Sequence, residues 1–272
     1  MTLIKLGQFM AKILRAVRAN AGVRAMYSKR LIKELDAMQK SISYWLEAAY
    51  KKREVDIVGD ANPAADILRR FNADARRWLK KWALLSGWLS KKMVNDMDVA
   101  TTSSMKSAFK AAGFSIPFNA TRNLNTVTKA LIAENVNLIK SIGSQYLTDV
   151  RGIVTRGVSM GRDLGYIKDE LAKRYEITER RARFIARDQC DKASQAIQRT
   201  RDQEIGITEG IWKHVPGIKT SRETHIEMDG KRFKIDEGLY DRNVGRNVLC
   251  GELPGCRCTY FRVLPEFGEE KR

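Results

Sequence analysis

The chain has 272 residues, of which 43% are hydrophobic and 30% are charged, so it can bury a core of its own and is neither disordered nor fibrous. Its 50 Lys and Arg outnumber its 32 Asp and Glu, and the formal net charge of +18 suits a polyanionic neighbour such as nucleic acid. Charge alone names no function.

The first 25 residues do not have the pattern of an export signal. Lys5, Lys12, Arg15 and Arg18 interrupt every apolar run before it reaches the length of a signal core. The sequence also lacks an uninterrupted run of about 18 apolar residues, so we expect no membrane span and folding in the cytoplasm of the producing cell. In a reducing compartment the four cysteines are expected to be thiols or metal ligands rather than disulfides.

From Leu3 to about Val55, apolar residues recur every three or four positions, which predicts helix. The stripe includes Leu31, Leu35, Met38, Ile42, Trp45, Leu46 and Ala49. A thin helical arrangement cannot bury so broad a stripe completely. We therefore expect part of it to remain exposed as an interface.

Residues 59–63, with Gly59 and Pro63 at their ends, interrupt this pattern, and a second helix is predicted from about Ala64. Its apolar stripe comprises Ile67, Phe71, Ala75, Trp78, Trp82, Leu85 and Leu89. Six basic residues fall mostly off this stripe: Arg69, Arg70, Arg76, Arg77, Lys80 and Lys81. They form either a solvated helix face or a face that binds nucleic-acid phosphates.

The region from Thr101 to Asn125 is less periodic and predicts a loop with short helical pieces. A long helix is predicted from about Val127 to Val158, and a shorter one from Tyr166 to Tyr175. Thr178 has the position of an N-cap for a further helix that ends near Glu204.

After Gly206 the sequence changes to short apolar runs separated by Gly-rich turns. Residues 211–215, 231–235 and 258–263 predict strands, and Asp229-Gly230 suits a hairpin turn. The fold class is therefore α+β: a mainly helical N-terminal region followed by a small, β-containing, loop-rich C-terminal subdomain. We divide the chain into a helical interaction region (1–130), a second helical part (131–205) and the β subdomain with a candidate metal site (206–272).

Several motifs between roughly Asn135 and Pro265 resemble the phage head morphogenesis family, the minor head proteins typified by the F protein of Mu-like phages. The matching residues keep the order and spacing of these motifs. They are Glu179 to Gln189, Glu204 to Ile207, Trp212, Arg222 to His225, Met228 to Gly230, and Pro254 to Cys258. The helices before Asn135 carry no motif of the family.

The resemblance implies a minor capsid protein of the virion that acts in head morphogenesis at or near the portal vertex. Its implied partners are the portal protein and other head proteins, and its implied location is the phage head, assembled in the host cytoplasm. Contact with packaged double-stranded DNA and help in its ejection are further expectations. The sequence departs from the family pattern at Cys250, where relatives commonly have Pro before Gly-Glu.

His225, Cys256 and Cys258 form the strongest constellation for a cofactor, because imidazole and thiolate are ligands that Zn²⁺ prefers. Cys-x-Cys on an extended chain directs both sulfur atoms to one face. Cys250 is the expected fourth ligand, with His214 and Asp229 as alternatives. The competing interpretation is that the cysteines are small packed residues and that His225 hydrogen-bonds a carbonyl group.

The sequence does not favour an enzyme, because two histidines are too few for a metallonuclease of the His-Asn-His type and no Gly-rich phosphate loop is present. A hydrolase stays open as an alternative. A metal-dependent enzyme could use acid chemistry by Glu223, Glu227 and Asp229. A cysteine hydrolase could use Cys258 as the nucleophile and His225 as the base. A basic DNA-binding accessory protein is the other alternative.

The segment Arg187-Asp188-Gln189 allows two interpretations. It is either a buried polar network that fixes its helix to the β subdomain or part of an exposed charged helix.

Overall fold

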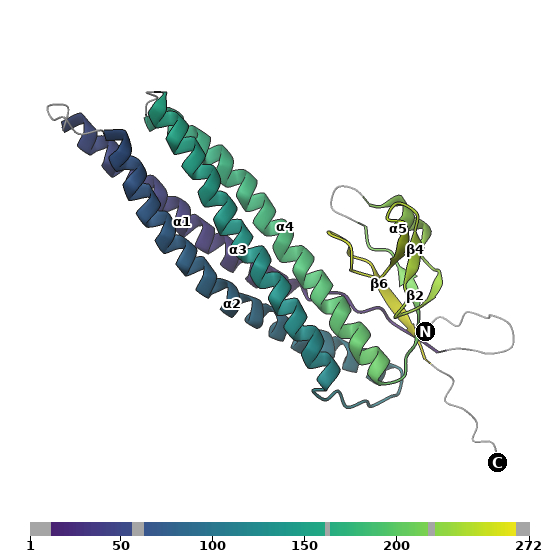
Figure 1. Ribbon diagram of the computed structural model, residues 1–272. Coiled ribbons are helices and arrows are strands. Elements are labelled where there is room, and N and C mark those ends of the chain that lie inside the picture. The colour runs from purple at the N-terminus through teal and green to yellow at the C-terminus, as the bar shows by residue number, and fades with distance from the viewer. Residues whose placement is uncertain (1–11, 56–62, 161–163, 217–220, 265–272) are drawn as a thin grey trace, which may run out of the picture. The chain divides into compact units, whose positions relative to one another are not determined.

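The computed structural model describes residues 12–55, 63–160, 164–216 and 221–264. Four long helices are followed by a short helix and small strands, which confirms the α+β fold class (Figure 1). The long helices are α1 (Ala21–Val55), α2 (Pro63–Ala111), α3 (Arg122–Ser159) and α4 (Leu164–Glu204). The smaller elements are β1 (Ile13–Leu14), β2 (Glu209–Lys213), α5 (Glu223–Glu227), β3 (Arg232–Lys234), β4 (Leu239–Asp241), β5 (Arg246–Val248) and β6 (Thr259–Val263).

The chain divides into two compact units, and each is discontinuous in sequence. Ala25–Lys92 and Ile132–Ala186 make up the helical unit. Met1–Arg24, Met93–Leu131 and Arg187–Arg272 make up the mixed unit. The sequence-based division into regions 1–130, 131–205 and 206–272 concerns which parts of the chain fold by themselves. It stays a prediction.

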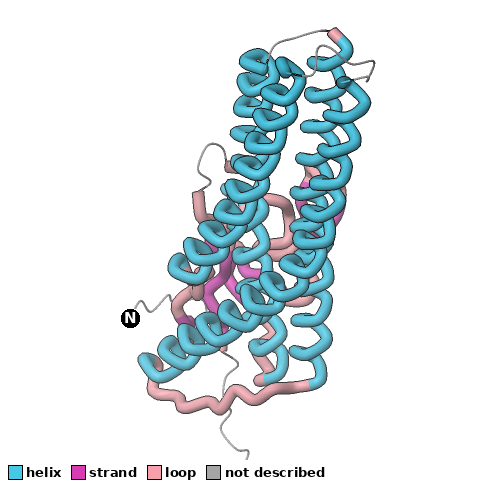
Figure 2. The backbone as a smooth tube through the Cα atoms, turned by 90° about the vertical axis from the view of Figure 1, so that its left-hand side faces the viewer, coloured by secondary structure: helices cyan, strands magenta, loops and turns pink. Residues whose placement is uncertain are grey.

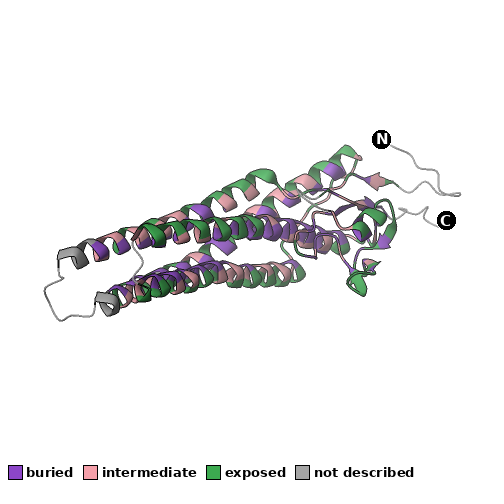
Figure 3. Ribbon diagram, turned by 90° about the horizontal axis from the view of Figure 1, so that it is seen from above, coloured by how far each residue is buried: buried purple, intermediate pink, exposed green. Residues whose placement is uncertain are grey.

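Within the helical unit, the stripe of α1 is buried rather than left open for a partner. Leu31, Leu35, Met38 and Ile42 are at most 1% exposed, whereas Trp45 is 40% exposed. The expectation of a broadly exposed stripe was wrong, because segments of α2, α3 and α4 all pack in the same unit. In Figure 3, buried and exposed residues alternate along the helices with helical periodicity.

The stripe of α2 is confirmed. Ile67, Phe71, Trp78, Trp82 and Leu89 are buried, and the six basic residues predicted to lie off the stripe are all exposed. Trp88, by contrast, is half exposed and lies under the Arg30 guanidinium, which is 5.3 Å from the ring centre.

Three predicted boundaries differ from the structure. Residues 13–14 form a strand where helix was expected, and the expectation for residues 3–10 lies outside the described residues. Helix α2 continues through Thr101 to Ala111 because Met105 and Phe109 are buried along it; tertiary burial outweighs weak periodicity. Thr178 lies inside the continuous helix α4, where its hydroxyl donates to the Arg174 carbonyl (3.0 Å) instead of capping a new helix.

The mixed unit contains a four-stranded antiparallel sheet in the order β1-β6-β2-β3 and a two-stranded ribbon, β4-β5 (Figure 2). Gly230 has the positive φ expected from the sequence (80°), but it connects α5 to β3 rather than forming a two-residue hairpin. Leu14 of β1 packs with Phe109, Ile207 and Leu264 in a buried apolar cluster. This cluster therefore contains residues from parts of the chain that are far apart in sequence.

Buried polar contacts attach the end of α4 to this unit. Asp188 accepts a hydrogen bond from the Gly255 N–H (2.6 Å), which confirms the polar-network interpretation for this residue. Near the helix end, Asp202 accepts hydrogen bonds from Arg262 Nε (2.7 Å) and Tyr260 Oη (2.7 Å). Asp202 and Arg262 are both fully buried.

Two helical glycines allow a matched test of packing in the helical unit. A Cβ atom at Gly143 of α3 would lie 2.8 Å from Trp82 Cγ, whereas a Cβ atom at Gly87 of α2 would meet nothing within 4 Å. We expect Gly143→Ala to lower the free energy of unfolding by about 1–3 kcal/mol through overpacking. Gly87→Ala is expected to raise it by about 0.5–1 kcal/mol, because it restricts the unfolded chain. Urea denaturation of both variants checks this, and equal effects would contradict the assigned packing.

Candidate metal centre

The predicted metal ligands lie at the ends of three elements of the mixed unit. His225 is on α5, Cys256 and Cys258 precede β6, and His214 directly follows β2. Strands β2 and β6 pair in register, with Lys213 opposite Thr259, so His214 and Cys258 are brought to the same end of the sheet. Pairing of the strands thus joins positions that are 44 residues apart.

The side chains of these residues converge. The ligand atoms of His225, Cys256 and Cys258 all lie within 4.8 Å of one another, and all three residues are buried. His225 Nδ1 is 3.4 Å from Cys256 Sγ and 3.6 Å from Cys258 Sγ. His214 Nδ1 is 3.5 Å from Cys258 Sγ. This geometry is compatible with metal binding.

A buried carboxylate lies on the other side of the His225 ring. Asp241 Oδ2 is 3.3 Å from His225 Nε2 and also accepts a hydrogen bond from the Thr224 hydroxyl (3.1 Å). The other oxygen, Oδ1, accepts from the Asn243 N–H (2.9 Å). Burial raises the pKa of Asp241, but these hydrogen bonds outweigh burial and hold that pKa below its usual value. Asp241 is therefore an ionised partner for the imidazole.

The thiols differ in acidity. A hydrogen bond with Cys256 lowers the pKa of Cys258 to about 7, against the opposing effect of burial. The same contact, followed by burial, raises the pKa of Cys256. Burial lowers the pKa of His214, so this ring is neutral at pH 7. Thiolate and neutral imidazole are the forms that bind metal ions.

Two of the residues considered as a fourth ligand make other polar contacts. Cys250, the expected ligand, packs in the same buried cluster as Cys256 and Cys258, and its thiol donates to the Thr259 carbonyl oxygen (3.3 Å). Neither Cys250 nor His214 belongs to the group of three whose ligand atoms all lie within 4.8 Å of one another. Asp229 accepts hydrogen bonds from the His214 backbone N–H (2.7 Å) and from Lys213 Nζ (3.1 Å). The expectation that Cys250 is a ligand stays a prediction, and in this conformation its sulfur faces the backbone of Thr259.

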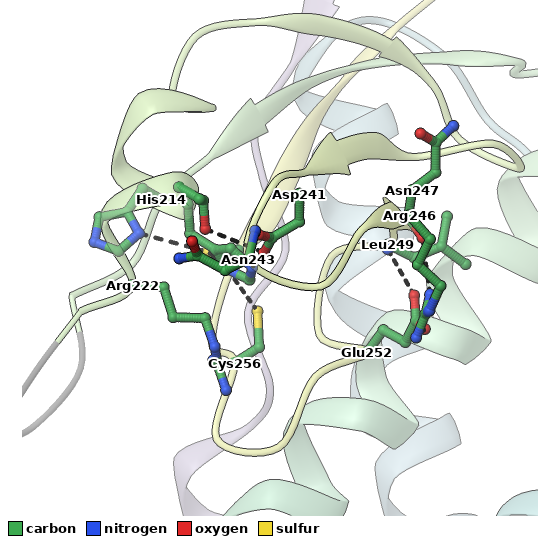
Figure 4. Close-up of polar contacts among 12 residues, drawn as sticks. His214, Arg222, Asp241, Asn243, Arg246, Asn247, Leu249, Glu252 and Cys256 are labelled. Carbon is green, nitrogen blue, oxygen red and sulfur yellow. Dashed lines mark hydrogen bonds and ion pairs between the residues drawn. The ribbon is translucent and has the colours of Figure 1, made fainter.

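Polar contacts hold the loop that precedes the two cysteines (Figure 4). The Leu249 N–H donates to Glu252 (2.8 Å), and Arg246 pairs with the same carboxylate (2.6 Å). Arg222, just before α5, donates to the Pro254 carbonyl oxygen (2.8 Å). The loop is thereby fixed to α5, which carries His225.

The arrangement suits a closed site better than a catalytic one. Cys258 and His225 are each 2% exposed, so both side chains are shielded from solvent. Glu223 and Glu227 are both paired with Arg242 at the surface. Hydrogen bonding by that guanidinium lowers the pKa of Glu227, which makes it a poor general acid at neutral pH.

Sequence reasoning found His225, Cys256 and Cys258 and ranked His214 below Cys250. It missed Asp241, because a single Asp in a turn-rich segment carries no signal of what its side chain will face. The basic residues assigned to nucleic acid lie together on α2, in the helical unit, and are no part of this cluster.

Part of the chain that includes this site is similar to a known protein family. Residues 148–261 match the family model described as phage Mu protein F like protein. This segment, which is less than half of the chain, is similar to the phage Mu F-like family. All four converging residues and Asp241 lie within the Mu F-like segment.

A protein of Haemophilus influenzae that is described as uncharacterized is 36% identical over 145 residues. That match spans 52% of this chain and 30% of the Haemophilus protein. No solved structure matches the chain.

The resemblance drawn from the motifs is confirmed. The family model covers the segment in which most of those motifs lie. Among the helices that the structure describes, none combines the length and apolar character needed to cross a bilayer.

Proposed function

We propose that this protein is a minor head protein that acts in phage head assembly at or near the portal vertex. The match of residues 148–261 to the Mu F-like family carries this proposal. The helical unit supports a role in docking, because Tyr44 (66% exposed) and Trp88 (50% exposed) display aromatic side chains of the kind that anchor protein interfaces.

The head role is tested by deleting the coding sequence from the phage or prophage that carries it and by analysing purified heads. We expect the tagged protein in wild-type heads and a reduced yield of complete heads without it. Cross-linking mass spectrometry should join it to the portal protein. Normal heads after deletion would overturn the assembly role, whereas cross-links to the major capsid protein alone would overturn the vertex location.

A second candidate function, binding of double-stranded DNA, is favoured by the net charge of +18 and the exposed basic face of α2. This face comprises Arg69, Arg70, Arg76, Arg77, Lys80 and Lys81. Lys81 is paired with Glu34 (2.9 Å), but Arg76, Arg77 and Lys80 have no ion-pair partner among the described residues. These three side chains are therefore available to phosphates.

We expect non-specific duplex binding whose log K falls steeply with log salt as counterions are released. The triple substitution Arg76→Gln, Arg77→Gln and Lys80→Gln should reduce the magnitude of that slope by about 3, roughly one unit for each lost phosphate contact. Fluorescence anisotropy between about 50 and 200 mM salt measures it. The matched control replaces Lys29, Lys33 and Lys40 of α1, which are also exposed, and an equal loss there would reject the α2 face.

A further inference from the structure

We propose that His214, His225, Cys256 and Cys258 bind one zinc ion in a closed tetrahedral site. Zn–S bonds of about 2.3 Å and Zn–N bonds of about 2.0–2.1 Å at tetrahedral angles place nitrogen and sulfur about 3.5 Å apart. The three nitrogen–sulfur distances in the structure are 3.4, 3.5 and 3.6 Å. These three distances match the spacing expected between ligands of a common ion, and His214 approaches the cluster through Cys258.

Both sulfur atoms approach the same atom, His225 Nδ1, and a neutral ring nitrogen offers a single position for a hydrogen bond. Cys256 can bond to His225, and Cys258 can bond to His214. The third close approach, between Cys258 and His225, is then not explained by a hydrogen bond to the ring nitrogen. An ion in the centre accounts for all three approaches, because each ligand atom then directs its own lone pair toward the metal.

Asp241 prepares His225 for this role. A carboxylate beside Nε2 favours the tautomer with its proton on Nε2, which leaves the Nδ1 lone pair free for the ion. The carboxylate is itself held by Thr224 and by the Asn243 N–H. Asp241 is a positioning residue, since its contact is with the ligand and not with the metal.

The charge of the site also fits zinc. In the complex both cysteines are thiolates, and two thiolates with two neutral imidazoles neutralise a divalent cation. Three of the four ligands are buried and His214 is half-buried, so a neutral complex avoids the cost of placing an unpaired charge in the interior. Four protein ligands leave no open coordination position, as in structural zinc sites.

The ion would join the end of β2, helix α5 and the start of β6. The strands of this region are only three to five residues long, apart from the two-residue β1, so they supply few pairing contacts of their own. Small subdomains of this kind gain the most from a metal cross-link, because the free energy of binding becomes free energy of folding.

Metal analysis of the full chain, purified without chelator, tests the site. We expect one zinc per chain, and X-ray absorption is expected to show two sulfur and two nitrogen neighbours. Cys256→Ser, Cys258→Ser and His225→Gln should each abolish stoichiometric zinc. Cys250→Ser is the matched control and should keep one ion with an unchanged spectrum. Metal-free protein would overturn the proposal. An absorption spectrum with three sulfur neighbours would show that Cys250, and not His214, is the fourth ligand.

Two further variants separate the roles of His214 and Asp241. His214→Gln is expected to lose one nitrogen neighbour in the absorption spectrum, and an unchanged spectrum would remove it from the ligand set. Asp241→Asn is expected to weaken zinc affinity about 10- to 100-fold in competition with a chelator while the ligand spectrum stays the same. Unaltered affinity would contradict its positioning role. If a variant fails to fold, refolding with Co²⁺ and recording the visible spectrum reports its ligands directly.

Discussion

Replacing Arg262 by Met is expected to lower the free energy of unfolding by about 3–5 kcal/mol. The substitution leaves the Asp202 carboxylate fully buried without a counter-charge, because Arg262 supplies two hydrogen bonds to it through Nε, at 2.7 and 2.8 Å. It also removes the bond from Arg262 to the Arg15 carbonyl oxygen (3.2 Å). Urea denaturation followed by circular dichroism measures the loss.

The double variant Asp202→Leu, Arg262→Met is the control. Removing both charges eliminates the unpaired carboxylate, so most of the lost stability should return, although the Tyr260 hydroxyl then lacks its acceptor. A single variant within about 0.5 kcal/mol of the wild type would show that the pair does not hold α4 to the sheet. If the double variant is as unstable as the single one, lost packing of the Arg262 side chain, rather than the unpaired charge of Asp202, causes the loss of stability.

The helical stripes were predictable because they depend on local periodicity alone. Ile67, Phe71 and Trp82 repeat at helical spacing, and burial follows from that spacing whatever packs against them. The end of α2 and the continuity of α4 were not predictable in the same way. Thr178 can cap a helix or bond back within one, and burial of Leu171 and Ala182 on either side decides for the continuous helix.

The candidate site was predictable in part for a similar reason. The spacing of Cys256 and Cys258 on an extended segment is local information, and it places two sulfur atoms on one face. The choice between His214 and Cys250 depends on strand register and on the direction of a turn, which the sequence does not report. Pairing of Lys213 with Thr259 brings His214 to Cys258, while the Cys250 thiol bonds to the Thr259 carbonyl oxygen.

A fragment that begins at residue 131, where the second predicted region starts, is expected not to fold on its own. The fragment lacks β1, which pairs with β6, and it lacks Phe109 of the apolar cluster around Ile207 and Leu264. It also lacks Asp98, which pairs with the nearly buried Arg201 (2.9 Å). In the helical unit, removal of α1 and α2 exposes the inner faces of α3 and α4.

Amide dispersion in a two-dimensional NMR spectrum and near-ultraviolet circular dichroism provide the measurement. Both should indicate an unfolded or molten state for residues 131–272 alone, and co-expression with residues 1–130 should restore the native signals, because the two pieces together contain both compact units. A dispersed spectrum from the fragment alone would instead support the sequence-based division. Residues 1–130 would then be free to serve mainly as a docking region, and the contacts of β1 and Phe109 would be dispensable.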